Sequence, residues 1–207
     1  MRTTARRAGW RELREAAISA TRWGWPVVPG TFLGPDQRWY GREGARRLGP
    51  IQDSWRENPV TDSAEAYEVW SEHPYGVLLV CGCGVDVLEL PARLRGLLAF
   101  PEVPWIPLAM TAPPVRWLLF TVTGSGALSG ELSQVGMRLH GAGAWVALPP
   151  TAVEFLSPQR WLEPPARGVT GQLRTVDEIQ HGLLTVLLRS GLGIGSGDDD
   201  EKQPLRC

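Results

Sequence analysis

One acidic residue, Asp86, lies inside an apolar segment, where a carboxylate could bind a divalent metal ion. Residues 85–90 read Val-Asp-Val-Leu-Glu-Leu and predict a buried strand. Side chains alternate between the two faces of a strand, so Leu88 shares the face of Asp86, while Glu89 points away unless a β-bulge re-aims it. Divalent ions prefer clustered carboxylate oxygens. The face of Asp86 therefore offers one carboxylate where metal chemistry would use two.

Two later segments place basic and aromatic side chains where a phosphate or a base could bind. Arg138 and His140 precede residues 141–143, Gly-Ala-Gly, whose backbone could form an anion-binding nest. Alternatively, these glycines only form a tight loop into a strand. Trp117 beside Arg116 could stack on a base, although a Trp within an apolar strand more often lies in a core. We predict Arg116, Trp117, Arg138 and His140 as candidate nucleotide or nucleic-acid contacts.

The cysteines and histidines form no recognisable metal site. Cys81 and Cys83 could supply half of a zinc site, but structural zinc usually takes four ligands. The other donors, Cys207 and three His, have no recognisable spacing. We therefore expect small buried side chains at the two neighbouring cysteines and no resident metal. Three Cys also argue against a disulfide framework and fit a reducing cytosol.

The composition indicates a globular protein of ordinary size. The chain has 207 residues, of which 43% are hydrophobic and 21% are charged, enough for the core of one domain. It contains no run of 18 apolar residues and no charged segment before a short apolar one. We therefore expect neither a membrane span nor a secretory leader, and we expect a cytoplasmic location.

Charge is distributed unevenly along the chain. The net charge is −1, but residues 1–47 contain ten Arg against four acidic residues, and residues 198–201 read Asp-Asp-Asp-Glu. The basic segment could contact phosphate groups, or its arginines could form a solvated face. The sequence alone does not distinguish between these two interpretations of the basic segment.

Helical and strand patterns alternate along the first half of the chain. Apolar residues recur at helical spacing in residues 9–23, including Trp10, and Gly24 ends this helix. Asp62 can cap a second helix that extends to about residue 71, with Tyr67 facing inward. Residues 30–60 show no clear period and are predicted as a loop. The remaining predicted elements are strands at 25–29, 76–80, 85–90, 117–122 and 145–148, and helices at 94–100 and from Thr175 to about 189. Thr175 and Glu178 form a second capping box at the start of this last helix.

This order of elements predicts an α+β (α/β-type) fold in one compact unit. The domain is expected to span residues 9–190. Residues 191–207 are rich in Gly, Ser and Asp, and we expect a disordered C-terminal tail there.

Several segments together resemble the N-terminal domain of bifunctional DNA primase/polymerases (Prim-Pol), in the archaeo-eukaryotic primase superfamily. The resemblance runs from about Ala16 to Trp161. It implies a domain of two lobes with a mixed central sheet flanked by helices. The segments that carry it are ATRWGWPVVP at 20–29, Thr61-Asp62 followed by Trp70 and Pro74, GVDVL at 84–88, and GAGAWVALPPT at 141–151.

The resemblance also implies where catalytic groups would lie. Enzymes of this family use an Asp-x-Asp pair, a later His and a further Asp before the Gly-rich strand, and two metal ions bridged by carboxylates support phosphoryl transfer. These positions correspond here to Asp86, Leu88, Trp117 and Arg138. A guanidinium repels cations, and an indole N–H only donates hydrogen bonds. Neither can replace a metal ligand.

With three of four positions replaced, the resemblance predicts a catalytically degenerate domain. Asp86 would be an inactive remnant, no cofactor is expected, and the domain would act as a nucleotide-, nucleic-acid- or protein-binding regulatory module. The alternative is an active DNA primase/polymerase that uses Mg²⁺ or Mn²⁺ and recruits Glu89 through local irregularity. A third hypothesis is an interaction protein whose former cleft is filled by Trp117 and Leu88. The oligomeric state is not predicted.

Overall fold

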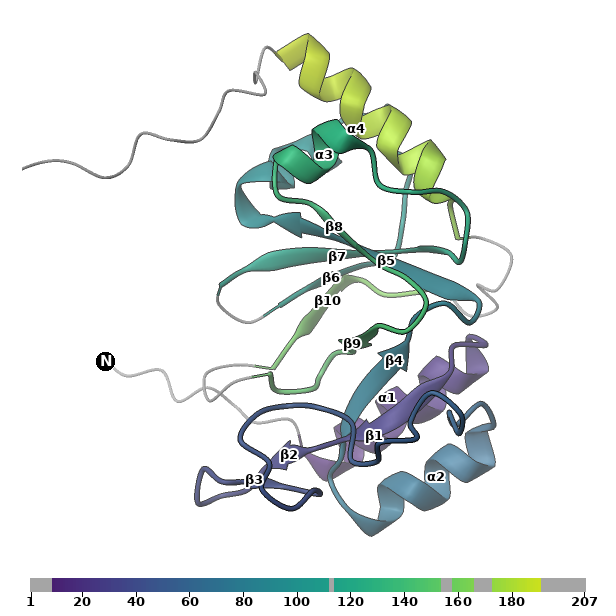
Figure 1. The fold of residues 1–207 in the computed structure, drawn as a ribbon, viewed down its shortest axis with the longest axis vertical. Coiled ribbons are helices and arrows are strands. Elements are labelled where there is room, and N and C mark those ends of the chain that lie inside the picture. Colours follow the sequence, from purple (N-terminus) through teal and green to yellow (C-terminus); the bar gives the residue numbers. More distant parts are fainter. Residues whose placement is uncertain (1–8, 112–113, 154–157, 166–172, 191–207) are drawn as a thin grey trace, which may run out of the picture.

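The chain folds into two lobes stacked along the long axis of the molecule (Figure 1). The computed structural model describes residues 9–111, 114–153, 158–165 and 173–190. The predicted tail at 191–207 lies outside the described residues. The elements of the first lobe are α1 (Trp10–Arg22), β1 (Val27–Gly30), β2 (Phe32–Leu33), β3 (Trp39–Tyr40), α2 (Ser63–Glu72), β4 (Gly76–Val80) and β9 (Trp145–Ala147).

The second lobe is built on a five-stranded sheet in the order β10-β6-β7-β5-β8. Helices α3 and α4 cover the face of this sheet that points away from the first lobe (Figure 1). The elements of this lobe are β5 (Val85–Pro91), the 3-10 helix η1 (Ala92–Ala99), β6 (Leu108–Met110), β7 (Arg116–Val122), α3 (Gly130–Gln134), β8 (Arg138–His140), β10 (Arg160–Glu163) and α4 (Val176–Ser190).

The α+β class predicted from the sequence is confirmed. The first lobe holds a three-stranded sheet in the order β1-β4-β9, and β2 and β3 form a separate hairpin. The pairings between the named strands are antiparallel. Within the described residues, a parallel pairing occurs as an isolated bridge between Thr121 and Arg174.

Both predicted helix caps are present. The Asp62 carboxylate accepts hydrogen bonds from the backbone N–H groups of Ala64 and Glu65, at 2.8 and 3.1 Å. The Thr175 hydroxyl accepts from the Glu178 backbone at 3.1 Å, and the Glu178 carboxylate accepts in return from the Thr175 backbone. These reciprocal bonds satisfy N–H groups that have no partner within the helix.

Some local predictions were wrong. Residues 30–60 contain the short β2–β3 hairpin rather than only a loop. Tyr67 is 53% exposed rather than inward, because α2 buries the side of the helix that carries Ala66 and Trp70. The guanidinium of Arg14 on α1 lies over the Tyr67 ring, 4.8 Å from its centroid. Trp10 is 46% exposed at the start of α1. Within the described residues, no helix is long and apolar enough to span a membrane.

Candidate functional site between the two lobes

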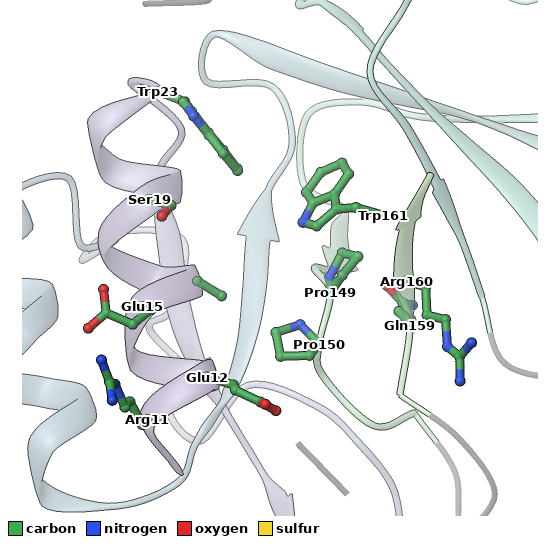
Figure 2. Close-up of a pocket in the computed structure, with 11 residues that line it drawn as sticks. Arg11, Glu12, Glu15, Ser19, Trp23, Pro149, Pro150, Gln159, Arg160 and Trp161 are labelled. Atoms are coloured by element: carbon green, nitrogen blue, oxygen red, sulfur yellow. The ribbon is translucent and has the colours of Figure 1, made fainter. Parts of the chain in front are cut away.

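A cavity of about 810 Å³ separates α1 from the segment that leads into β10 (Figure 2). Trp23 and Glu15 line its first-lobe side, and Gln159 and Trp161 line its second-lobe side. Gln159 is buried, and its Oε1 atom has no hydrogen-bond partner within the described part of the chain.

The predicted site residues are on β5, β7 and β8, toward the other edge of the five-stranded sheet, and none of them lines this cavity.

The two faces of β5 pack into different cores. Pairing between β5 and β7 continues without a register shift along the whole strand. Val85 and Val87 belong to a core shared with the first lobe, which defines the interlobe face of the sheet. Leu88 and Leu90 belong to a second core with α4, which defines the helix-covered face. Glu89 therefore lies on the interlobe face, and no bulge brings it round to Asp86.

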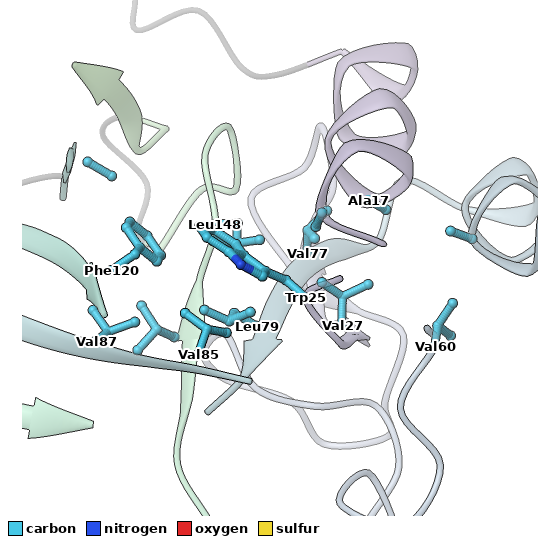
Figure 3. Packing of buried hydrophobic residues seen from close by; sticks show 14 of the residues in the cluster. Ala17, Trp25, Val27, Val60, Val77, Leu79, Val85, Val87, Phe120 and Leu148 are labelled. Atoms are coloured by element: carbon cyan, nitrogen blue, oxygen red, sulfur yellow. The ribbon is translucent and has the colours of Figure 1, made fainter. Parts of the chain in front are cut away.

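The interlobe core joins the lobes through large aromatic side chains. Trp25, which precedes β1, stacks on Phe120 of β7 with ring centroids 4.9 Å apart (Figure 3). Trp25 is 1% exposed and Phe120 is fully buried. Offset stacking adds a modest gain to the free energy of burying both rings. This contact fixes the first lobe against the sheet that carries Glu89.

Asp86 is enclosed by hydrogen-bond donors. Its Oδ1 atom accepts from the Gly82 backbone N–H at 2.9 Å and from the Thr123 hydroxyl at 3.0 Å, and its Oδ2 atom accepts from the Gly124 backbone N–H at 2.9 Å. The side chain is 4% exposed. These bonds tie the turn before β5 to the loop after β7. The carboxylate oxygens thus serve the structure of two loops.

Glu89 is surrounded by basic side chains. It forms an ion pair with Arg116 of β7, and its Oε2 atom lies 2.6 Å from Nε2 of His140 on β8. Arg138 is the direct cross-strand partner of Glu89 in the pairing of β5 with β8. We call these four residues the Glu89 cluster. The side chains of Glu89, Arg116 and His140 are 12%, 23% and 26% exposed, so the cluster is partly accessible to solvent.

Electrostatics favour the ionised form of Glu89. Burial by itself would raise the pKa of this carboxyl. The hydrogen bond and charge of His140, together with the charges of Arg116 and Arg138, outweigh burial and lower the pKa of Glu89. The carboxylate is therefore charged at neutral pH, and its charge is offset by the basic groups around it.

The structure brings three of the four predicted contacts together and separates the fourth. Arg116, Arg138 and His140 share the interlobe face. Trp117 instead points into the core on the helix-covered face, where it is 6% exposed and its indole N–H donates to the Ala92 carbonyl at 3.3 Å. This is the core position that the sequence left as the alternative. Its ring is not available to stack on a base in this arrangement.

The four positions implied by the family resemblance also fall on two faces. Asp86, Leu88 and Trp117 are on the helix-covered face, whereas Arg138 is on the interlobe face beside Glu89. A single metal site would need its ligands on one face. Among the described residues, no group of three or more His, Cys, Asp and Glu side chains is arranged to hold a metal ion.

The pair of cysteines offers no better ligand set. Burial, followed by the nearby charge of Asp86, raises the pKa of the Cys81 thiol to about 12. A thiol must lose its proton to ligate a metal, so Cys81 is poorly suited to that role at neutral pH. Cys83 is exposed, and both cysteines are free.

From the sequence, Glu89 was considered only for the alternative of an active primase/polymerase. The spacing of Arg138 and His140 nevertheless indicated a basic strand face that could pair with it. Arg138 and His140 are two residues apart, so on a strand they must share a face. The same rule joins Glu89 to Val87 rather than to Asp86. What the sequence did not supply was β8 itself, because a strand of three residues leaves little pattern to detect.

These features define a two-lobed α+β domain with a polar cluster on the sheet face between the lobes. Residues 16–178 match the family model of the bifunctional DNA primase/polymerase N-terminal domain (Prim-Pol). The match covers most of the chain, and the chain belongs to this family. A comparison with curated protein sequences found no significant match.

Proposed function

We propose that this Prim-Pol domain binds nucleotide phosphate at its interlobe face and does not carry out metal-dependent nucleotidyl transfer. The observation that carries the proposal is the charge of the Glu89 cluster, which sets one carboxylate against two guanidinium groups and an imidazole. A two-metal site needs carboxylates that bridge cations. Arginine and protonated histidine instead bind phosphate through charge-assisted hydrogen bonds. The excess of basic groups supports binding of an anion.

The placement of the cluster supports the same conclusion. If the interlobe face is the counterpart of the family's catalytic face, the relevant β5 positions are Val87 and Glu89 rather than Asp86 and Leu88. One acidic residue of β5, Glu89, then lies on that face, and it is already paired with Arg116 and His140. On β8 the position beside it is the basic Arg138. A cation placed there would meet two guanidinium groups.

The geometry gives less support to an active primase/polymerase. That alternative requires Glu89 and Asp86 to converge on one ion, yet the two carboxylates lie on opposite faces of a strand with regular pairing. The hydrogen bonds of Asp86 to Gly82 and Gly124 would also have to break. We extend the proposal to a regulatory binding module of the cytoplasm whose partner is a nucleotide, a nucleic acid or a protein.

Nucleotide binding without a divalent ion tests the proposal. Isothermal titration calorimetry with a deoxynucleoside triphosphate in EDTA should show saturable binding. Arg138→Ala should weaken the nucleotide affinity roughly three- to tenfold, because one phosphate contact is lost. Glu89→Gln should strengthen binding because it removes the negative charge from the cluster. Arg174→Ala is the matched control, since Arg174 is a half-exposed arginine that pairs with Glu178 at the start of α4.

Two results would count against this function. The first is binding that appears only after Mg²⁺ or Mn²⁺ is added and is abolished by Glu89→Gln. The second is equal weakening by Arg138→Ala and Arg174→Ala, which would mean that the nucleotide responds to net charge rather than to this site.

A further inference from the structure

The cavity between α1 and β10 contains a buried hydrogen-bond acceptor that has no donor. Gln159 lines this cavity of about 810 Å³, and its side chain is 4% exposed. Among the residues that the structure describes, none donates to its Oε1 atom. The Gln159 backbone is fixed, because its N–H donates to the Thr151 carbonyl at 3.1 Å. A ligand that brings an N–H group to this oxygen would recover the free energy lost when the oxygen left water.

Two indole rings form the aromatic part of the cavity. Trp23, which follows α1, and Trp161 of β10 both line it and are partly exposed. Their ring centroids are 5.8 Å apart with an interplanar angle of 88°, so the rings meet edge to face. Trp161 also contacts Trp25 and Phe120 of the interlobe core, which hold its ring in place. Partly exposed indoles attract apolar groups, and their faces also attract cations.

An acidic side chain points across the cavity. Figure 2 shows Glu12 reaching from α1 across the opening, whereas Arg160 points away from α1. Arg11 and Glu15 extend from another side of α1 in the same view, and their opposite charges offset each other. The Glu12 carboxylate also accepts from the Gly9 backbone N–H at 3.0 Å, which closes the helix cap but brings no full positive charge. The cavity therefore presents a negative charge to a ligand.

We propose that this cavity binds an organic ammonium ion with an apolar body. The ammonium group donates an N–H to the Oε1 atom of Gln159, and the carboxylate of Glu12 offsets its charge. The apolar body packs on the indoles of Trp23 and Trp161. The volume of the cavity lies within the roughly 300–1,000 Å³ typical of ligand sites.

Other classes of ligand fit the cavity less well. A carboxylate or a phosphate would be repelled by Glu12 and would bring no donor to Gln159. A quaternary ammonium satisfies the charge but has no N–H, and a neutral alcohol has a donor but no charge. The cavity uses none of the residues of the Glu89 cluster. The inference therefore goes beyond the proposed nucleotide site and does not depend on it.

Isothermal titration calorimetry with three related compounds tests the site. Phenethylammonium has a charge, an N–H donor and an aromatic body, and it should bind saturably with a Kd of about 1 mM or lower. Its N-trimethyl derivative keeps the charge but has no N–H, and phenethyl alcohol keeps a donor but has no charge. Each of these two compounds should bind about tenfold more weakly, because each lacks one of the two polar interactions.

Two sources of the ammonium group are distinguished by a fourth compound. Nα-acetyl-lysine amide carries the same cation on the side chain of a protein residue. Tighter binding of phenethylammonium would assign the site to a free amine. Tighter binding of the lysine derivative would assign it to a lysine side chain of a partner protein.

Two variants assign the interactions to named groups. Gln159→Met removes the acceptor and nearly keeps the length of the side chain, so it should weaken phenethylammonium binding about tenfold and leave the affinity for the trimethyl derivative unchanged. Glu12→Gln removes the charge but keeps an oxygen that can close the helix cap, and it should weaken both ammonium compounds about threefold. The matched control is Glu68→Gln, which removes an exposed carboxyl from α2. The control should leave both affinities unchanged.

Three outcomes would overturn the inference. They are equal binding of phenethylammonium and phenethyl alcohol, equal weakening of both ammonium compounds by Gln159→Met, or equal affinities in Glu12→Gln and Glu68→Gln. Circular dichroism checks that Gln159→Met is folded, and if it is not, the three compounds and Glu12→Gln decide the question. The nucleotide titration is run on the same proteins and should be unaffected by Glu12→Gln. Loss of one activity without the other therefore shows which of the two sites has failed.

Discussion

Asp86 and Glu89 lie three residues apart on β5, yet the protein uses their carboxylates in different ways. Asp86 faces loop backbone and accepts hydrogen bonds from Gly82, Thr123 and Gly124. Glu89 faces the first lobe and is paired with the basic side chains of β7 and β8. Strand alternation puts the two on opposite faces, and each face then determines what its carboxylate meets. An acidic residue within a strand motif is therefore weak evidence for a metal site until its face is known.

The largest loss of stability is expected when a buried side chain on the helix-covered face is removed. Trp117→Ala should lower the free energy of unfolding by about 4 kcal/mol, because it removes a large buried side chain and leaves a cavity. Urea denaturation measures this loss. The control is Trp105→Ala, whose side chain is 48% exposed and which should change stability by less than about 0.5 kcal/mol. A Trp117→Ala protein of normal stability that no longer binds nucleotide would reverse the assignment of this ring to the core.

A smaller loss is expected when the enclosed carboxylate is removed. Asp86→Ala should reduce the free energy of unfolding by about 3 kcal/mol, because it leaves two backbone N–H groups and one hydroxyl without their acceptor. Asp86→Asn should lose less, since its amide oxygen can keep part of this hydrogen bonding. Urea unfolding of both variants, together with nucleotide titration, gives the comparison. Normal stability combined with lost nucleotide binding would place Asp86 in a functional site.

The sequence predicted the parts of this comparison that depend on local pattern. The alternation in residues 85–90 correctly placed Glu89 opposite Asp86, and the caps at Asp62 and Thr175 were found because capping depends on residues close in sequence. The Glu89 cluster was harder to predict, because it depends on β8 pairing with β5 across some fifty residues. Short elements such as β6, β10 and α3 were missed for the related reason that three to five residues show little periodicity.

Removing the carboxylate of Glu89 should lower the free energy of unfolding by a smaller, pH-dependent amount. Because the pKa of Glu89 is lowered in the folded protein, its stabilisation is present above the ordinary carboxyl pKa of about 4.3 and is lost as pH falls through the lower folded value. Glu89→Gln should cost roughly 1 kcal/mol at pH 7 and flatten the decline in stability on the acid side of pH 4.3. Urea midpoints measured from pH 7 to pH 3 test this.

The control for this pH dependence is Glu68→Gln, which removes an exposed carboxyl from α2. It should leave both the stability at pH 7 and its acid decline unchanged. A decline that is equally steep in Glu89→Gln and in the wild-type protein would show that the Glu89 cluster does not hold this carboxyl in its charged form.

Primer extension on a single-stranded template, with Mn²⁺ or Mg²⁺ and all four deoxynucleotides, tests the central claim most directly. The account predicts no extension above background by the wild-type protein, under conditions in which the same preparation binds deoxynucleoside triphosphate in EDTA. Extension that requires the metal and disappears in Glu89→Gln would contradict it, and would show that the interlobe face still works as a polymerase centre.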